Sequence, residues 1–261
     1  TSTCGSRTAR TRTATCTSSS SSVTVVAPGV VDPRSPGGRP ASWAATGRSG
    51  GISAWPYDSL NLADYVGDDP EARVVADVVL DVPMGKWEKI MPEHLEKAAE
   101  KTPVRPGDIV IVNTGWHHKY ADSAEYYAYS PGFYKEAGEW FVSKGVKAVG
   151  TDTQALDHPL ATAIGPHGPA EAQGGLLPWA CKEYEEETGK KVADEFALWE
   201  PCHREILTHG IYGFENVGGD VDKVTGKRVT FAAFPWRWRG GDGCIVRLVA
   251  ITDPTGTYRI E

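Results

Sequence analysis

Histidine is missing from the first 93 residues of this 261-residue chain, and all seven histidines lie between His94 and His209. A metal or acid/base site that uses imidazole must therefore draw on the later part of the sequence. The sequence has no run of about 18 apolar residues, which excludes a membrane-spanning helix. The N-terminal residues are rich in Ser, Thr and Arg and lack the apolar stretch of a secretory signal, so we expect a cytoplasmic protein.

Positive charge is also scarce. The chain has 27 Lys and Arg against 34 Asp and Glu, a formal net charge of -7, which argues against a nucleic acid or an anionic membrane as a partner. The five cysteines are an odd number with no close-spaced pair, so they fit neither a disulfide framework nor a structural zinc site. The cysteines are most simply explained as reduced thiols.

Residues 1–60 have an unusual composition. The first 50 residues contain no Leu, Ile, Met, Phe, Tyr, His, Lys, Glu, Asn or Gln, and Asp32 is their one acidic residue. Two explanations remain open: a low-complexity tail that buries too little apolar surface to fold, or a stretch read out of frame. We therefore predict an anomalous segment at 1–60 and an α/β domain at 61–261.

Apolar runs alternate with amphipathic stretches from about residue 73 onward. β-branched runs predict strands at 74–82, 108–113, 146–152, 211–215, 228–234 and 244–252. Helices are expected from Pro92 to before Pro103, from Ser130 to Gly145, at 176–188 and at 201–209. The pattern predicts one α/β domain in which a mixed sheet is packed by helices.

Two residues near the end of this pattern are candidates for chemistry. His203 lies on the short helix expected at 201–209, and Glu215 lies at the end of the strand that follows the turn at Gly210. This reversal of the chain can bring the imidazole and the carboxylate together. The competing interpretation is that Glu215 merely caps the next turn.

Loops next to the predicted strands carry further polar and aromatic residues. We expect a substrate pocket to be lined by Trp116, His117, His118, Asp152, Asp157, His158 and His167. Because neighbouring side chains of an extended chain point to opposite sides, at most one of His117 and His118 should face a given site. The competing interpretation is that each histidine is a surface or hydrogen-bonded core residue and that Asp157 caps the turn before Pro159.

Three tryptophans suggest an aromatic wall for a flat substrate, namely Trp116, Trp236 and Trp238. The alternative is that they belong to the core. A third hypothesis is a binding module whose exposed Trp236 and Trp238 contact a carbohydrate or a protein partner.

Six short segments follow one another in a fixed order: VVLDV at 78–82, VNTGW at 112–116, TDTQALDHP at 151–159, His203, Glu215-Asn216, and FPWRWRGGDGCIVR at 234–247. Their order and the 12-residue step from His203 to Glu215 resemble the putative cyclase family, the metal-dependent hydrolases that include bacterial kynurenine formamidase. The resemblance implies a swivelling β/β/α fold and a homodimer or larger homo-oligomer. It also implies that His203 and Glu215 are ligands of a divalent metal, Zn or Mn, and act in catalysis.

One hallmark of that family is missing. A His-x-Gly-Thr-His-x-Asp-x-Pro-x-His stretch upstream of the VVLDV-like strand supplies most of the family's metal ligands, and this chain has no histidine there. From the resemblance we predict a hydrolase in which metal-activated water attacks the carbonyl of a small cyclic or aromatic amide, lactam or lactone. The alternative is a non-catalytic scaffold that keeps the fold without the metal.

Overall fold

Four parallel strands form the centre of the fold in the computed structural model, which describes residues 23–26, 77–235 and 243–252. These strands are β2 (Asp77–Asp81), β4 (Ile109–Asn113), β6 (Ala148–Thr151) and β7 (Tyr212–Glu215). Antiparallel strands extend the sheet on both sides: β8 (Arg228–Ala233) and β10 (Leu248–Ile251), and β1 (Val23–Val26) and β9 (Gly243–Val246). The strand order is β10-β8-β2-β4-β6-β7-β1-β9.

The central strands are apolar because both faces of the sheet are covered there. All residues of β4 and β6 are buried, and β2 exposes only its last residue, Asp81. Continuous apolar runs of this kind are typical of parallel strands, whereas strands with one wet face alternate. The carboxyl ends of β2, β4, β6 and β7 consequently meet at one edge of the sheet.

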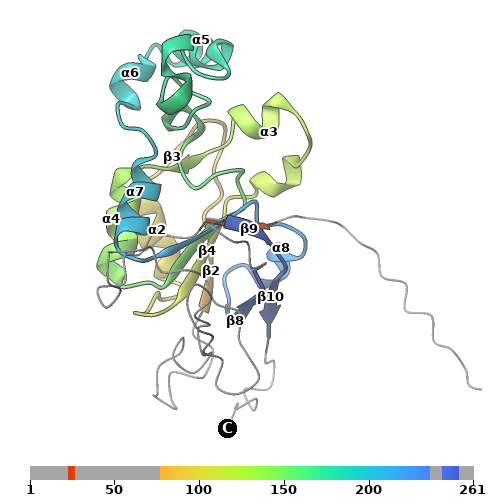
Figure 1. Cartoon of the computed structure of the whole chain (residues 1–261). Coiled ribbons are helices and arrows are strands. Elements are labelled where there is room, and N and C mark those ends of the chain that lie inside the picture. Colours follow the sequence, from red (N-terminus) through yellow and green to blue (C-terminus); the bar gives the residue numbers. More distant parts are fainter. Residues whose placement is uncertain (1–22, 27–76, 236–242, 253–261) are drawn as a thin grey trace, which may run out of the picture.

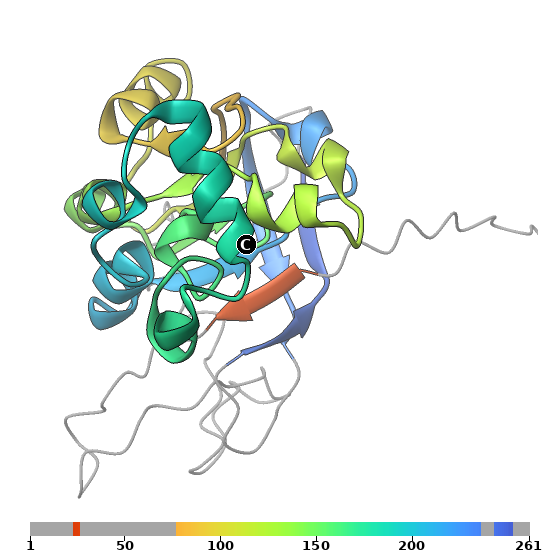
Figure 2. The same ribbon diagram turned by 90° about the horizontal axis from the view of Figure 1, so that it is seen from above.

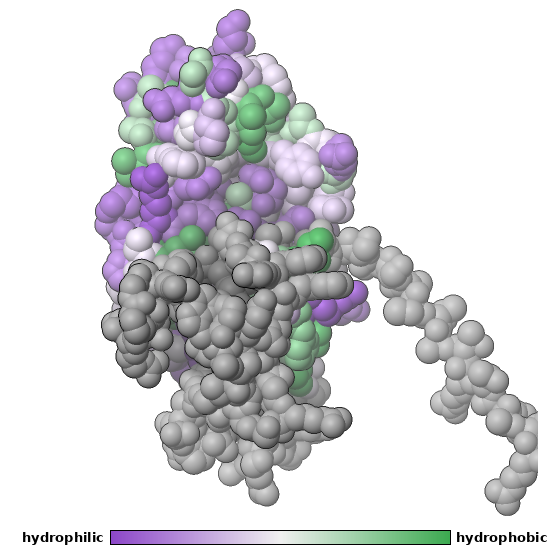
Figure 3. Space-filling view, viewed as in Figure 1, coloured by the Kyte–Doolittle hydropathy of each residue, from purple (hydrophilic) through white to green (hydrophobic). Residues whose placement is uncertain are grey.

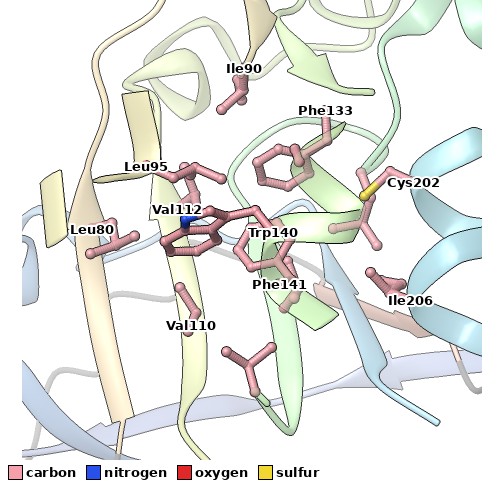
Figure 4. Packing of buried hydrophobic residues seen from close by; sticks show 14 of the residues in the cluster. Leu80, Ile90, Leu95, Val110, Val112, Phe133, Trp140, Phe141, Cys202 and Ile206 are labelled. Carbon is pink, nitrogen blue, oxygen red and sulfur yellow. The ribbon is translucent and has the colours of Figure 1, made fainter. Parts of the chain in front are cut away.

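Three helices cover one face of this sheet. They are α2 (Pro92–Ala99), α4 (Lys135–Lys144) and α7 (Pro201–Thr208), which lie next to one another in Figures 1 and 2. Their apolar sides meet the sheet in one buried cluster, which includes Phe141, Cys202 and Ile206 from the helices and Leu80 and Val112 from the strands (Figure 4). The other face is covered by a second apolar cluster to which α8 (Val221–Val224) contributes.

The remaining elements lie in the connections. Short strands β3 (Lys89–Ile90) and β5 (Gly132–Phe133) pair in parallel, and α3 (Ala124–Ala128) precedes β5. The described connections also contain the 3-10 helices η1 (Trp116–Lys119), η2 (Pro159–Ala161) and η3 (Gly168–Gln173). Helices α5 (Pro178–Thr188) and α6 (Val192–Glu195) lie together at the top of Figure 1. The face of this part that is seen in Figure 3 is largely hydrophilic with small separate apolar spots.

The mixed α/β fold predicted from the sequence is confirmed, with two local corrections. The helix expected to start at Ser130 starts at Lys135, because Gly132–Phe133 pairs with β3 instead; Gly145, with φ of 64°, ends it as expected. The strand expected at 244–252 is split into β9 and β10. The described residues do not include Trp236 or Trp238, and of segment 1–60 they include only Val23–Val26. The expectations for these parts of the chain therefore stay predictions.

No helix in the described part of the chain is long and apolar enough to cross a bilayer.

The buried face of α4 gives a first prediction. Phe141 is fully buried and its ring meets that of Phe133 edge to face at a centroid distance of 5.2 Å. Phe141→Ala should lower the free energy of unfolding by about 3–5 kcal/mol, because a cavity is left between the helix and the sheet. The matched control is Phe234→Ala at a ring that is 65% exposed, where we expect a change within about 0.5 kcal/mol. Urea denaturation measures both, and equal losses would contradict the packing described here.

Candidate active site at the carboxyl edge of the sheet

The loop after β6 supplies the central group of the site, the carboxylate of Asp157. Asp157 is completely buried, and its loop is held in place by β5: Phe133 N donates to Leu156 O and His158 N donates to Phe133 O, both at 2.8 Å. Gly132 is required at this close approach, because a Cβ there would lie 2.4 Å from the backbone nitrogen of His158. The position of the carboxylate is therefore set by backbone contacts.

Asp157 binds the first turn of α7. Its Oδ1 accepts a hydrogen bond from the backbone N–H of Cys202 at 2.8 Å, and its Oδ2 accepts from the backbone N–H of His203 at 3.0 Å. The same Oδ2 lies 2.5 Å from Nδ1 of the His203 ring. A carboxylate at a helix N-terminus satisfies backbone donors that have no partner within the helix. Asp157 thus fixes both the start of α7 and the orientation of the imidazole.

Glu215 approaches the opposite side of the same ring. As the last residue of β7, it places Oε1 3.0 Å from Nε2 of His203, and Oε1 also accepts a hydrogen bond from Leu156 N at 3.1 Å. The predicted convergence of His203 and Glu215 is therefore present. We call these three residues the Asp157–His203–Glu215 array.

The array changes the protonation of His203. Burial by itself would lower the pKa of the imidazole, but the hydrogen bonds to Asp157 and Glu215 outweigh burial and raise the pKa to about 10. Without a bound cation the ring is thus protonated at neutral pH. The neighbouring Cys202 is different, because complete burial raises the pKa of its thiol well above the ordinary value, and it cannot act as a thiolate nucleophile.

The backbone is strained on both sides of the array. Glu200, directly before α7, has φ of 44°, and Asn216, directly after β7, has φ of 61°. Residues other than glycine seldom adopt such angles, and where they do they cluster at functional sites. Glu200 is held by a hydrogen bond from its N–H to Ala161 O at 2.8 Å.

The array opens into a cavity of about 640 Å³. His203 and Glu215 lie in its wall, and its other described lining residues are Gln154, Ala155, Thr162, Ala163, Ile164, Leu176, Glu200, Arg204, Leu207 and Thr208. The volume is that of a small-molecule site. Among these residues none except His203 has an aromatic ring, so the tryptophan wall expected from the sequence is not found in the described part of the cavity.

A second cluster of histidines lies after β4. Gly115, with φ of 81°, turns the chain into η1, where the rings of His117 and His118 lie 4.1 Å apart. Both rings reach one carboxylate, that of Asp222 in α8, with Nε2 to Oδ2 distances of 3.3 and 3.1 Å. The expectation that adjacent histidines face different sites is wrong here, because the chain is helical rather than extended. These three residues form the His117–His118–Asp222 cluster.

Asp152, expected to contact substrate, is the buried partner of this cluster. Its Oδ2 lies 2.9 Å from Nδ1 of His117, and its Oδ1 accepts hydrogen bonds from the N–H and the hydroxyl of Thr114. The hydrogen bond to Asp152 is the main reason why the pKa of His117 is raised.

The other residues predicted to bind substrate are not among those that line the cavity. Trp116 is buried, and its Nε1 donates to Tyr126 O at 3.0 Å. His158 is completely buried, stacks on Phe196, and is kept neutral by burial, which lowers its pKa to about 3. His167 is half-buried with no hydrogen-bond partner at Nε2 among the described residues. Their roles in substrate binding stay predictions.

Several residues of these sites were missed in the sequence. Arg204 and Glu200 line the cavity. Arg204 directly follows His203 in the sequence, and Glu200 directly precedes the expected helix, so their positions could have indicated that they belong to the site. Asp222 gave no such signal, because 105 residues separate it from His117 and only the sheet brings the two together. Tyr126, whose hydroxyl donates to Asp152 O at 3.2 Å and also binds Asn216 Oδ1, was missed for the same reason.

Comparison with known proteins supports the fold and the family resemblance. A family model described as putative cyclase matches residues 40–158. The family resemblance is confirmed. The match begins inside the predicted N-terminal segment and ends before His203, so the assignment of His203 and Glu215 rests on the motif order and on geometry.

Two curated relatives match over short stretches. A purine nucleoside phosphorylase of Corynebacterium glutamicum is 52% identical over 42 residues, which cover 16% of each chain. A kynurenine formamidase of Bordetella avium is 35% identical over 81 residues, which cover 30% of this chain and 34% of the relative. The chain thus matches about a sixth and about a third of these relatives.

Solved structures match over much more of the chain. An isatin hydrolase A from Ralstonia solanacearum has a TM-score of 0.53 at 17% identity, and an isatin hydrolase bound to the product analogue thioisatinate has 0.52 at 16% identity. Each match covers 87% of this chain and 70% of the isatin hydrolase chain. At this identity the likeness shows the fold alone.

The raised pKa of His203 predicts how stability depends on pH. The unfolded ring has a pKa of about 6.5 and the folded ring about 10, so the array's contribution is complete below about pH 6.5 and is lost as pH rises toward 10. In chelator-treated protein, the free energy of unfolding should fall less steeply over this range in His203→Gln than in the wild type. Urea denaturation at pH 6 to 9.5 measures the slopes.

The control for this prediction is His209→Gln, at an exposed histidine on the end of α7. It should keep the wild-type slope, since the array is untouched. Identical slopes for the wild type and His203→Gln would show that the array does not hold the proton.

Proposed function

We propose that this protein is a hydrolase of a small cyclic or aromatic amide, lactam or lactone, with His203 and Glu215 as its reacting groups. The observation that carries the proposal is the Asp157–His203–Glu215 array in the wall of a cavity of about 640 Å³. The relative named kynurenine formamidase supports an amide as the substrate class.

The array also fits part of a divalent-metal site. Nε2 of His203 and Oε1 of Glu215 are 3.0 Å apart, and the other ring nitrogen is held by a buried carboxylate, as is usual for metal-binding histidines. We propose Zn or Mn as the ion, which would polarise the scissile carbonyl and activate a water molecule. Two protein ligands are fewer than the three or four of a stable site, and the described residues place no third His, Cys, Asp or Glu ligand beside them.

The residues of the array can move the required protons by themselves. Glu215 accepts the proton of the water that attacks the carbonyl carbon. In the metal-free array, His203 is held as an imidazolium and gives its Nε2 proton to the departing nitrogen or oxygen as the bond to the carbonyl carbon breaks. When Nε2 holds an ion instead, the ring has no proton there to give. Asp157 keeps the ring in place and stabilises its positive charge while it is protonated.

The cavity favours a substrate with an apolar ring and a polar group. Ile164, Leu176 and Leu207 supply aliphatic surface, while Arg204 supplies a positive charge. A carboxylate or carbonyl on the ring would therefore be attracted to the same wall. We further propose a cytoplasmic homodimer or larger homo-oligomer, which the family resemblance supports.

Substitution of the array tests the proposal. Glu215→Gln keeps the shape of the side chain but removes the proton acceptor, so kcat/KM for an N-formyl arylamine or a cyclic aryl lactam should fall at least about 100-fold. Asp157→Asn should cost about 10–100-fold, since the imidazole loses its orienting carboxylate. The assay is hydrolysis followed by absorbance, with the metal content of each variant measured in parallel.

The control is His209→Ala at the exposed end of α7, which should keep wild-type activity. Glu215→Gln with nearly full activity would show that the reacting groups lie elsewhere. A wild-type protein without hydrolase activity and without metal, even after supplementation, would instead support the metal-free, non-catalytic scaffold.

A further inference from the structure

We infer that the His117–His118–Asp222 cluster is a second metal site, which binds a divalent ion of the zinc class through three protein ligands and one water molecule. The cluster shares no residue with the Asp157–His203–Glu215 array. The inference therefore stands whether or not the proposed hydrolase function is correct.

The spacing of the donors matches a tetrahedral ion. Nε2 of His117 and Nε2 of His118 lie 3.3 and 3.1 Å from Oδ2 of Asp222, and all three ligand atoms lie within 4.8 Å of one another. Donors bound to zinc at about 2.0–2.2 Å in a tetrahedron are about 3.3–3.6 Å apart. The two nitrogen–oxygen distances are thus already close to those of a tetrahedral site.

Buried groups behind the cluster orient two of the three ligands. The completely buried carboxylate of Asp152 binds Nδ1 of His117 at 2.9 Å, which leaves Nε2 to point at the ion. Asn113 Nδ2 donates to Oδ1 of Asp222 at 3.0 Å, which leaves Oδ2 to face the two rings. Carboxylate and amide partners of this kind are the usual outer shell of metal-binding residues.

The chemistry of the donors selects the class of ion. Two imidazoles and one carboxylate suit Zn²⁺ and its transition-metal neighbours, whereas Ca²⁺ and Mg²⁺ take oxygen ligands. The side chains of His118 and Asp222 are 65% and 50% exposed, while that of His117 is 8% exposed. The ion would thus be reached from solvent and keep an open position for water, as in sites with three protein ligands.

Zinc titration of the chelator-treated full chain tests the inference. His203→Ala/Glu215→Gln serves as the background, so that the array cannot contribute, and isothermal titration calorimetry measures Zn²⁺ binding. In this background we expect saturable binding that His118→Ala or Asp222→Asn weakens at least about tenfold, since each removes a ligand. Both changes lie at exposed positions, and thermal unfolding without zinc checks that the variants are folded.

His209→Ala in the same background is the matched control, an exposed histidine on another element, and it should leave the titration unchanged. Zinc taken up by cysteines would be the same in all variants. The inference is overturned if the background binds no zinc in the micromolar range, or if His118→Ala and Asp222→Asn bind it as tightly as His209→Ala does. Because the background variant already lacks the array, neither result bears on the hydrolase proposal, which the activity assay tests separately.

Discussion

The buried carboxylate of Asp157 is the contact on which the candidate active site depends. It joins the loop after β6 to the first turn of α7 through two backbone N–H groups and holds the His203 ring through Nδ1. A buried charge without partners would be strongly destabilising, so the loop, the helix and the imidazole must be arranged together. Because α7 leads into β7, the same contact brings Glu215 to the other side of the ring.

One loop supplies both histidine-orienting carboxylates. Asp152 and Asp157 lie five positions apart after β6, and each is completely buried against Nδ1 of one histidine, His117 or His203. In both cases Nε2 of that histidine faces a more exposed carboxylate, that of Asp222 or Glu215. The sheet edge therefore carries two separate imidazole–carboxylate groups with the same arrangement of a buried and a more exposed carboxylate. One opens into the cavity, and the other opens directly to solvent.

Much of the fold was predictable because local signals agreed with it. The apolar runs of β2 and β4 mark buried parallel strands, and Gly145 and Gly189 end their helices in the left-handed conformation. The His203–Glu215 pair could be proposed from the chain reversal at Gly210 together with the motif order of the family resemblance. Asp222 could not, because its nearness to His117 depends on how α8 follows β7. The helical turn at Gly115 was also not readable, so the two adjacent histidines were expected to diverge.

The account depends most on the claim that Asp157 holds the Nδ1 proton of His203. NMR of metal-free protein with ¹⁵N-labelled histidine observes this proton directly, and His203→Gln assigns its resonance. We expect a strongly downfield, hydrogen-bonded Nδ1–H signal that persists above pH 8, consistent with a pKa of about 10, and that is lost in Asp157→Asn. If the His203 ring instead titrates like an exposed histidine, with no hydrogen-bonded Nδ1 proton, the array described here is wrong.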